Sequence, residues 1–227
     1  MSMTRTSSPS AKPRRRPGRP GGDEQALRAH LLDTALLRFA RTGIAGTSLR
    51  AIAIEAGVTP AMLHYYFGDK VRLQQAVVEE RLLPVLAPLR EQLEQAGDDP
   101  VELIGLFVRG IGSVVARHAW LPPLWVREVL CEGGALREVL FNQLVPAVPQ
   151  LLATRFAQAQ ADGRLNPALD PRLLVVSLVG LTLFPAAGAP IWQPALDAGG
   201  IGPDTMLNHT LALLQQGIGV NPSGTCS

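Results

Sequence analysis

Residues 47 to 73, TSLRAIAIEAGVTPAMLHYYFGDKVRL, constrain the fold more than any other stretch of the chain. Thr47 and Ser48 carry side-chain oxygens that can cap a helix, and Gly57 stands where a helix commonly ends in a left-handed residue. Thr59 and Pro60 follow, a pair that favours the start of a second helix. Between the first cap and the glycine, apolar residues recur at the i, i+3, i+4, i+7 spacing of one helix face, namely Leu49, Ile52, Ala53 and Ala56. We therefore predict a helix-turn-helix.

The second helix should bury one face and present a small residue and then an aromatic residue on the other. At about 100° per residue, Leu63 and Phe67 share the packing face, whereas Ala61 and Tyr65 point away from it. Such a helix can enter a DNA major groove, about 12 Å wide, with its N-terminal residues at the base edges. This geometry predicts that the motif reads DNA.

Another helix is expected to begin just after the motif. Asp69 can cap it, and the Lys70 ammonium then lies beside free N–H groups at a positive helix end that suits a phosphate. The alternative is an ordinary αα-hairpin in which the run HYYF is only an aromatic core patch. Two caps, a glycine turn, an N-terminal proline and an aromatic run within 27 consecutive residues favour the DNA-reading interpretation.

The motif resembles the N-terminal domain of the tetracycline-repressor (TetR) family of bacterial transcription regulators. The likeness spans roughly residues 24 to 75 and rests on Thr47, Ile52, Ala53, Ala56, Gly57, Val58, Thr59, Leu63, Tyr66, Phe67, Asp69, Lys70 and Leu73. In that family the second helix reads the operator, a homodimer binds a pseudo-palindrome, and a helical C-terminal domain binds an inducer that releases the DNA. The resemblance implies backbone or phosphate contacts at Thr47, Thr59, Tyr66 and Lys70, and groove-facing roles for Pro60, Ala61, Met62 and Tyr65. His64 stands where the family most often has tyrosine, and its imidazole can donate one hydrogen bond to DNA.

Residues 1 to 22 form a basic arm without an acidic residue. Its cations are Arg5, Lys12, Arg14, Arg15, Arg16 and Arg19, so the arm carries +6 and the rest of the chain −4, although the whole chain has a net charge of only +2. Such a segment is expected to be disordered alone and to attract DNA phosphates without sequence preference. The run RRRPGRP also resembles arms that enter the minor groove, so base readout by Arg14, Arg15, Arg16 and Arg19 is the second interpretation.

Helical periodicity dominates the remaining sequence, and strand signals are scarce. Residues 23 to 43 should supply the third helix of the DNA-binding domain, and further helices are expected at Leu73 to Leu93, Pro100 to Arg117, Ala135 to Ala161, Pro171 to Phe184 and Pro203 to Gln216. Pro84, Pro88, Pro146 and Pro149 should kink or interrupt them. We therefore predict an all-α chain with a disordered arm (1–22), a three-helix helix-turn-helix domain (23–75), a helical effector-binding and dimerisation domain (76–219) and a tail (220–227).

The segment from Leu173 to Trp192 has 20 residues without a charge, close to the length of a bilayer span. Pro185, Gly188 and Pro190 should end its helix after Phe184, which favours a soluble helix hidden on most sides over a membrane helix. The family resemblance implies that the last two long helices pair into a four-helix dimer interface. A two-fold dimer would place two recognition helices about one DNA turn, some 34 to 36 Å, apart.

An apolar effector cavity is expected between the central helices. Its candidate lining residues are Phe107, Ile111, Trp120, Trp125, Val129, Phe141 and Phe156, with Arg109, His118, Arg127 or Glu128 as polar anchors. The alternative for each apolar residue is plain core, and for each charged residue a solvated surface. No positive cluster suited to a polyanion is present, so the effector should be a mostly apolar or amphipathic small molecule.

The sequence gives little support to an enzyme, a metal site or a cofactor. Cys131 and Cys226 lie 95 positions apart, the four histidines lack metal-ligand spacing, and no P-loop, GxSxG or dinucleotide glycine pattern is present. The basic start has no apolar run of about 7 to 15 residues and so does not predict a signal peptide. Two cysteines without such a signal suit a reducing bacterial cytoplasm, where the protein would associate with the nucleoid, and Cys131 is expected to be a buried small hydrophobe.

These observations favour a homodimeric, ligand-responsive DNA-binding regulator, and we predict that it acts as a repressor at a palindromic operator. The first alternative is a DNA-binding protein without a ligand, which acts as a constitutive or architectural binder through its arm. A C-terminal domain without a closed apolar cavity would favour that alternative. The second alternative is a membrane-associated helical protein.

Overall fold

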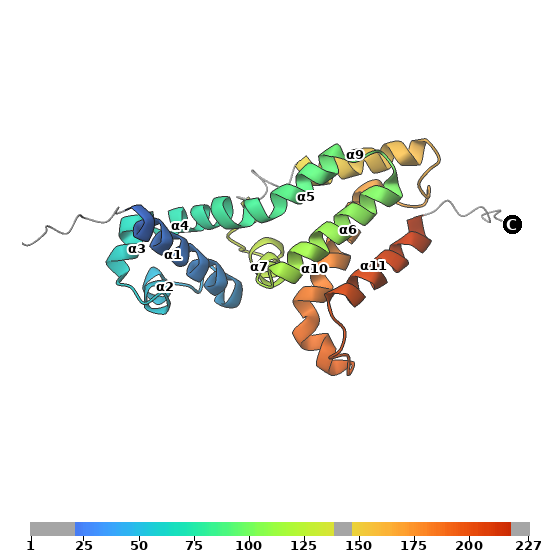
Figure 1. Cartoon of the computed structure of the whole chain (residues 1–227). Coiled ribbons are helices and arrows are strands. Elements are labelled where there is room, and N and C mark those ends of the chain that lie inside the picture. Colours follow the sequence, from blue (N-terminus) through green and yellow to red (C-terminus); the bar gives the residue numbers. More distant parts are fainter. Residues whose placement is uncertain (1–20, 139–146, 219–227) are drawn as a thin grey trace, which may run out of the picture.

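The computed structural model describes residues 21–138 and 147–218, and all regular elements in these two ranges are helices, which confirms the all-α fold class. The N-terminal part consists of α1 (Gly21–Thr42), α2 (Leu49–Glu55), α3 (Pro60–Phe67) and α4 (Lys70–Val77). It lies at one end of the molecule (Figure 1). The arm residues Arg14, Arg15, Arg16 and Arg19, together with Phe141, Pro146 and Cys226, lie outside the described residues.

The local signals of the helix-turn-helix act largely as expected. The Ser48 hydroxyl accepts a hydrogen bond from the Ala51 N–H (3.1 Å), and Gly57 adopts a φ of +70° at the turn. Thr59 occupies the N-cap of α3, but the prediction that its side chain caps the helix is wrong. The backbone carbonyl of Thr59 accepts from the Met62 N–H at 3.0 Å, so this N–H needs no side-chain acceptor.

The C-terminal part is arranged around α6 (Pro100–Arg117). Its other elements are the π-helical turns η1 (Val78–Leu82) and η2 (Val126–Leu130) and the helices α5 (Leu83–Gln95), α7 (Leu121–Trp125), α9 (Ala147–Ala161), α10 (Pro171–Ala195) and α11 (Pro203–Ile218). Helix α6 contacts α5, α9, α10 and α11. Ala135 lies in a turn after η2, so the helix predicted from Ala135 does not begin there.

A helical connector joins the two parts, as the sequence predicts, and a π-turn interrupts it. The Leu83 N–H donates to the carbonyl of Val78, five residues back. This wide turn lies directly before Pro84, whose ring would clash with the carbonyl of Glu80 in a regular helix. The Arg81 guanidinium donates to that carbonyl at 3.1 Å. The proline therefore widens the helix without ending it.

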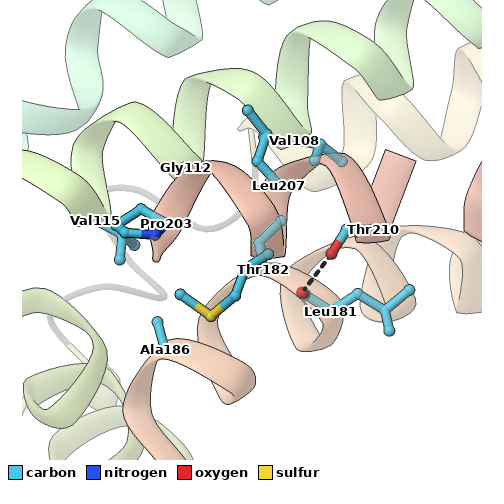
Figure 2. Close-up of a pocket in the computed structure, with 10 residues that line it drawn as sticks. Val108, Gly112, Val115, Leu181, Thr182, Ala186, Pro203, Leu207 and Thr210 are labelled. Carbon is cyan, nitrogen blue, oxygen red and sulfur yellow. Dashed lines mark hydrogen bonds between the residues drawn. The ribbon is translucent and has the colours of Figure 1, made fainter. Parts of the chain in front are cut away.

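Helix α10 continues to Ala195, so the prediction that it ends after Phe184 is wrong. Pro185 cannot donate to the carbonyl of Leu181, four residues back. The Thr210 hydroxyl of α11 donates to that carbonyl at 3.3 Å, as Figure 2 shows. A side chain 29 residues away thus satisfies the backbone group that the proline leaves free.

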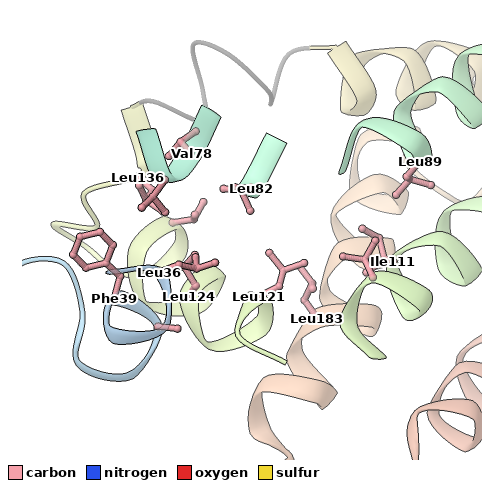
Figure 3. Close-up of a cluster of buried hydrophobic side chains, with 14 of the residues drawn as sticks. Leu36, Phe39, Val78, Leu82, Leu89, Ile111, Leu121, Leu124, Leu136 and Leu183 are labelled. Carbon is pink, nitrogen blue, oxygen red and sulfur yellow. The ribbon is translucent and has the colours of Figure 1, made fainter. Parts of the chain in front are cut away.

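One hydrophobic core runs through both parts of the chain (Figure 3). Phe39 of α1 and Leu82 of η1 are at most 1% exposed, and Leu121 and Leu124 of α7 are at most 2% exposed. In Figure 3, Ile111 of α6 and Leu183 of α10 lie beside Leu121, on the side away from Phe39. The DNA-binding part therefore shares its packing with the domain behind it, through η1 and α7.

Candidate DNA-reading surface and effector cavity

Helix α3 has one buried and one exposed face. Leu63 is fully buried and Phe67 is 5% exposed, whereas Pro60, Ala61 and Tyr65 are exposed, Tyr65 to 71%. On the exposed face, the Tyr65 hydroxyl donates to the Glu24 carboxylate at 3.2 Å, and the Tyr65 ring packs edge-on against the Tyr66 ring, with centroids 5.1 Å apart. This contact raises the pKa of Tyr65, because the bonded carboxylate disfavours the phenolate.

The residues beside the exposed face of α3 differ in the hydrogen-bond donors that they can offer to DNA. Nδ1 of His64 lies 2.6 Å from the carbonyl oxygen of Gly68, and since a carbonyl only accepts, Nδ1 carries the hydrogen. In a neutral ring Nε2 is then an acceptor, so His64 can donate to a phosphate only as imidazolium. Met62 and Tyr66 are half-buried, and Thr59 is exposed with no side-chain hydrogen bond.

Lys70 begins α4 at the position that the sequence predicts. Its N-cap Asp69 accepts from the Arg72 N–H at 2.8 Å, which confirms the predicted cap. The Lys70 ammonium lies 3.3 Å from the carbonyl oxygen of Ala45 and is half-buried. The ammonium therefore sits where the loop before α2 meets the positive end of α4.

Thr47 does not have the free donors that a phosphate contact needs. It is 1% exposed, its hydroxyl donates to the Gly43 carbonyl at 2.6 Å, and its N–H donates to the Ile44 carbonyl at 3.1 Å. Both donors hold the loop between α1 and α2, so the phosphate contact that the family resemblance implies at Thr47 would require one of these hydrogen bonds to open.

Two ion pairs fasten α1 to η1 behind the DNA-reading surface. The Arg28 guanidinium donates to both Glu80 carboxylate oxygens, at 2.5 and 2.6 Å, and lies over the Phe67 ring at 5.1 Å. This hydrogen bonding lowers the pKa of Glu80 and raises that of Arg28. The second pair joins Arg81 of η1 to Asp33 at 2.6 Å. Both pairs leave the connector little freedom to move without α1.

A buried carboxylate joins the loop after α1 to η2. Glu128 is 4% exposed, and its two oxygens accept from the backbone N–H of Ile44 (2.9 Å) and of Ala135 (3.1 Å). The neighbouring Arg127 donates to the Arg41 carbonyl at 2.8 Å. The prediction that Arg127 or Glu128 anchors an effector is wrong, because these side chains bind the backbone of the other domain.

An apolar cavity of about 240 Å³ lies between the connector and the C-terminal helices. Its lining comes from α5, α6, α7, α9 and α10: Leu83, Leu86, Ala87, Leu89, Arg90, Phe107, Ile111, Leu121, Trp125, Val148, Pro149, Val179 and Leu183. Among the described residues that line it, Arg90 alone is charged. A second space between α6, α10 and α11, drawn in Figure 2, measures only about 30 Å³ and is too small for a ligand larger than water.

Phe107, Ile111 and Trp125 line the cavity, whereas Trp120 and Val129 do not. Trp120 instead stacks on His118, with ring centroids 5.5 Å apart, and Val129 is buried in the core at η2. Phe156 is also fully buried core. Sequence reasoning missed Arg90 and the contributions of α5 and α10. Helical periodicity predicts which face of a helix points inward, but it does not predict which inward residues border a cavity.

Helix α10 exposes much of its apolar surface. It is the one helix in the described ranges that is long and apolar enough to cross a membrane, by length and composition alone, and 22% of its most apolar window is buried. The expectation of a helix hidden on most sides is therefore wrong for the single chain. Cys131 is exposed as well, because it follows the end of η2 at the surface, which contradicts the prediction that it is buried.

The three-helix arrangement, the exposed face of α3 and the positive end of α4 define a helix-turn-helix DNA-binding transcriptional regulator. Residues 31–77 match the family model described as bacterial regulatory proteins, tetR family. RutR, an HTH-type transcriptional regulator of Escherichia coli strain K12, is 29% identical over 199 residues, which cover 87% of this chain and 92% of RutR. The chain is therefore similar to the tetR family of bacterial regulatory proteins in its DNA-binding part, and to RutR over most of its length.

Solved structures of this family share the fold. The crystal structure of NalD, the secondary repressor of the MexAB-OprM multidrug efflux pump in Pseudomonas aeruginosa, has a TM-score of 0.62 at 25% identity and covers 87% of this chain and 98% of NalD. FadR from Bacillus subtilis, crystallised with stearoyl-CoA, has a TM-score of 0.63 at 19% identity, over 84% of this chain and 98% of FadR.

Proposed function

We propose that the protein is a homodimeric repressor that binds a palindromic operator and is released by a small, mostly apolar effector. The single observation that carries this proposal is the combination of an exposed recognition helix and an apolar cavity in one chain. The repressor NalD, a relative at 25% identity, is described as acting on a multidrug efflux pump. Binding to DNA places the site of action in the bacterial cytoplasm.

In this proposal α3 enters the major groove. Pro60, Ala61 and Tyr65 face the bases with Met62 beside them, because they occupy the exposed side of the helix. Thr59, Tyr66 and Lys70 contact phosphates from its flanks, with His64 joining them when protonated. Tyr65 must exchange its hydrogen bond to Glu24 for one to DNA or water when it enters the groove.

The exposed face of α10 supports dimerisation. Leu173, Val176, Phe184 and Ile191 are each at least 64% exposed. At about 100° per residue these four fall within about 80° of one another, with Gly180 between them. A long apolar stripe with a small residue at its centre suits close packing against the same helix of a second copy. A membrane is the weaker alternative, because α10 packs on α6, α7, α9 and α11 along its other side.

The cavity supports ligand control over the alternative of a constitutive or architectural DNA binder. It measures about 240 Å³, whereas an empty apolar cavity of about 150 Å³ already binds benzene. FadR shares this fold and was crystallised with stearoyl-CoA, a far larger molecule. In this chain a smaller apolar effector fits the cavity volume better.

The contacts at η2 support a route from cavity to DNA. Leu121 and Trp125 line the cavity on α7, and the chain continues directly into Arg127 and Glu128, which hold the backbone at Arg41 and Ile44. An effector that displaces α7 would therefore displace the loop before α2. The effector would favour a dimer conformation in which the recognition helices are misspaced for the operator.

The proposal is tested by selecting bound fragments from a genomic DNA pool with purified full-length protein at about 150 mM salt, where phosphate attraction no longer hides specificity. We expect a palindrome with half-sites about one turn apart. Recovery of random or A·T-rich DNA would instead support the arm-driven architectural binder. The recovered site then serves for Tyr65→Ala, expected to reduce sequence discrimination, and Lys70→Ala, expected to weaken all DNA alike and to flatten the salt dependence.

The dimer is tested separately by sedimentation of Phe184→Glu. A charge at the centre of the α10 stripe should shift the protein from dimer to monomer. The matched control is Leu196→Glu, a residue that is 73% exposed and lies just beyond the end of α10. A Phe184→Glu variant that remains dimeric would remove this face from the proposal.

A further inference from the structure

The start of α1 lies beside the exposed face of α3 (Figure 1). The Tyr65 hydroxyl donates to the carboxylate of Glu24, which is in the first turn of α1. Gly21 and Gly22, the last two residues of the basic arm, form the beginning of this turn. The rest of the arm is therefore attached to the folded chain at the edge of the surface that the recognition helix presents to DNA.

The position of this attachment point is fixed relative to α3. One helical turn after Glu24, the Arg28 guanidinium lies over the Phe67 ring of α3 at 5.1 Å and donates to the Glu80 carboxylate of η1. Helix α1 also contacts α2 and α4, which complete the DNA-binding part. The packing that orients α3 in a major groove therefore also places the arm at one side of that groove.

Four of the six cations of the arm are close to the attachment point along the chain, namely Arg14, Arg15, Arg16 and Arg19. A fully extended chain advances at most about 3.6 Å per residue, so Arg19 is within about 7 Å of Gly21 and Arg14 within about 25 Å. The minor groove next to an occupied major groove lies across one DNA strand, on the order of 10 to 15 Å from the centre of a groove about 12 Å wide. The four guanidinium groups are therefore within reach of that minor groove.

The residues between these arginines suit a narrow groove. Pro17 and Pro20 favour an extended backbone, and Gly18 adds no side chain, so the run RRRPGRP is slim apart from its cations. A·T-rich DNA has a narrow minor groove with enhanced negative potential. A guanidinium group is more weakly hydrated than an ammonium group, so it loses less hydration on entering such a groove. Phosphate attraction alone would act equally on every sequence, whereas these features favour A·T-rich DNA.

We infer that the guanidinium groups of Arg14, Arg15, Arg16 and Arg19 bind the A·T-rich minor groove that adjoins the major groove occupied by α3. Each half of the operator is then a composite site, in which α3 reads base edges and the arm reads the width and the floor of the neighbouring groove. The 2-amino group of guanine lies on this floor and excludes G·C pairs. The inference rests on the proposed DNA-binding function. Once α3 is bound, the short covalent connection makes the weak binding of the arm intramolecular and raises its effective concentration.

The test compares DNA duplexes that share the palindrome recovered by selection and differ only at base pairs outside the bases that α3 reads. In the three duplexes these positions hold A·T, G·C or inosine·cytosine pairs. Inosine lacks the 2-amino group of guanine, so an inosine·cytosine pair resembles A·T in the minor groove and G·C in the major groove. At about 150 mM salt, we expect full-length wild type to bind the A·T and inosine·cytosine duplexes about tenfold more tightly than the G·C duplex, the effect of one lost base-pair contact.

The fourfold variant Arg14→Lys, Arg15→Lys, Arg16→Lys, Arg19→Lys retains the charge of the arm and changes only the guanidinium groups. It should lower the preference for A·T over G·C to about threefold or less, keep the affinity for the G·C duplex within about threefold, and leave the salt dependence unchanged, because ammonium groups still attract phosphates. The matched control is Arg117→Lys, at an exposed arginine of α6, which should keep the wild-type preference. The four arm substitutions precede α1 and so leave the packing of the described residues intact.

Equal binding of the three duplexes by wild type would overturn the inference and leave the arm with phosphate attraction only. Binding of the inosine·cytosine duplex as weakly as the G·C duplex would also overturn it, because the preference would then arise outside the minor groove. A full preference in the lysine variant would show that the guanidinium groups do not carry it. The same duplexes with a scrambled core separate the two proposals: equal affinity for the palindrome and the scrambled core would overturn operator reading by α3, whereas the pairs around the core would still decide the role of the arm.

Discussion

Replacing Glu128 by alanine should destabilise the protein more than any surface substitution of the same kind. The side chain is 4% exposed, and its carboxylate accepts from the N–H groups of Ile44 at 2.9 Å and Ala135 at 3.1 Å. Alanine would leave both buried donors without an acceptor. One donor belongs to the DNA-binding part and the other to the C-terminal domain, so the substitution acts on the junction between them.

The expected magnitude follows from these two bonds. A hydrogen bond to a charged group contributes about 1.5 to 3 kcal/mol, and removal of the buried charge itself recovers part of that sum. We expect Glu128→Ala to lower the free energy of unfolding by about 3 kcal/mol. Glu128→Gln retains one carbonyl acceptor but directs an amide group at the second N–H, so it should cost about 1 to 2 kcal/mol.

Denaturant titration at one fixed protein concentration measures these differences, since the stability of a dimer depends on concentration. The matched control is Glu132→Ala, an exposed carboxylate four residues away, expected within about 0.5 kcal/mol of wild type. If Glu128→Ala lost no more stability than Glu132→Ala, the two hydrogen bonds would not hold the junction, and the route from cavity to DNA would lose its central contact.

Three further substitutions test the local arguments. Gly57→Ala should lower the free energy of unfolding by about 1 kcal/mol, because a φ of +70° strains a residue that has a Cβ. The added Cβ would meet no atom within 4 Å, so no steric clash adds to this cost. An unchanged melting temperature would contradict this account of the turn. The hydrogen bond from Arg28 lowers the pKa of Glu80 below its ordinary value of 4.5, so the contribution of Glu80 to stability is complete above pH 4.5 and is lost as the pH falls through the lowered pKa. The advantage of wild type over Glu80→Gln should therefore shrink as the pH falls below 4.5, and parallel pH profiles of the two proteins would refute this account. Thr210→Val removes the one side-chain donor that the described residues offer to the Leu181 carbonyl and should cost about 1 to 2 kcal/mol in denaturant titration. A neutral effect would mean that water replaces the hydroxyl.

The helix-turn-helix was predictable because its signals are local. Ser48 and Asp69 cap helices through N–H groups three residues away, and Gly57 sets the turn by its own φ. The apolar spacing around Leu63 likewise fixes which side of α3 is buried. Each of these interactions closes within one or two helical turns, so the sequence window that contains the signal also contains its partner.

The corrections at α10 and at Glu128 have the opposite property, because both depend on a partner far along the chain. The length of α10 depends on Thr210, which lies 29 residues after the carbonyl that it satisfies. The role of Glu128 depends on Ile44, 84 residues earlier. Thr47 differs from these two cases, because its donors bond the carbonyls of Gly43 and Ile44, four and three residues back in an irregular loop. No local pattern distinguishes these outcomes from the expected ones.

The difference between Trp120 and Trp125 shows how the C-terminal domain combines its tasks. Five residues separate them, so at about 100° per residue they point in directions about 140° apart, and only Trp125 reaches the cavity. Directly after Trp125, the π-turn η2 widens the helix, and its residues Arg127 and Glu128 bond the backbone of the DNA-binding part. A regular α-helix would rotate these two side chains through a different angle relative to Trp125. The π-turn thus allows one short segment to contact both the space for an effector and the loop before the recognition motif, which is the physical requirement for coupling between the two sites.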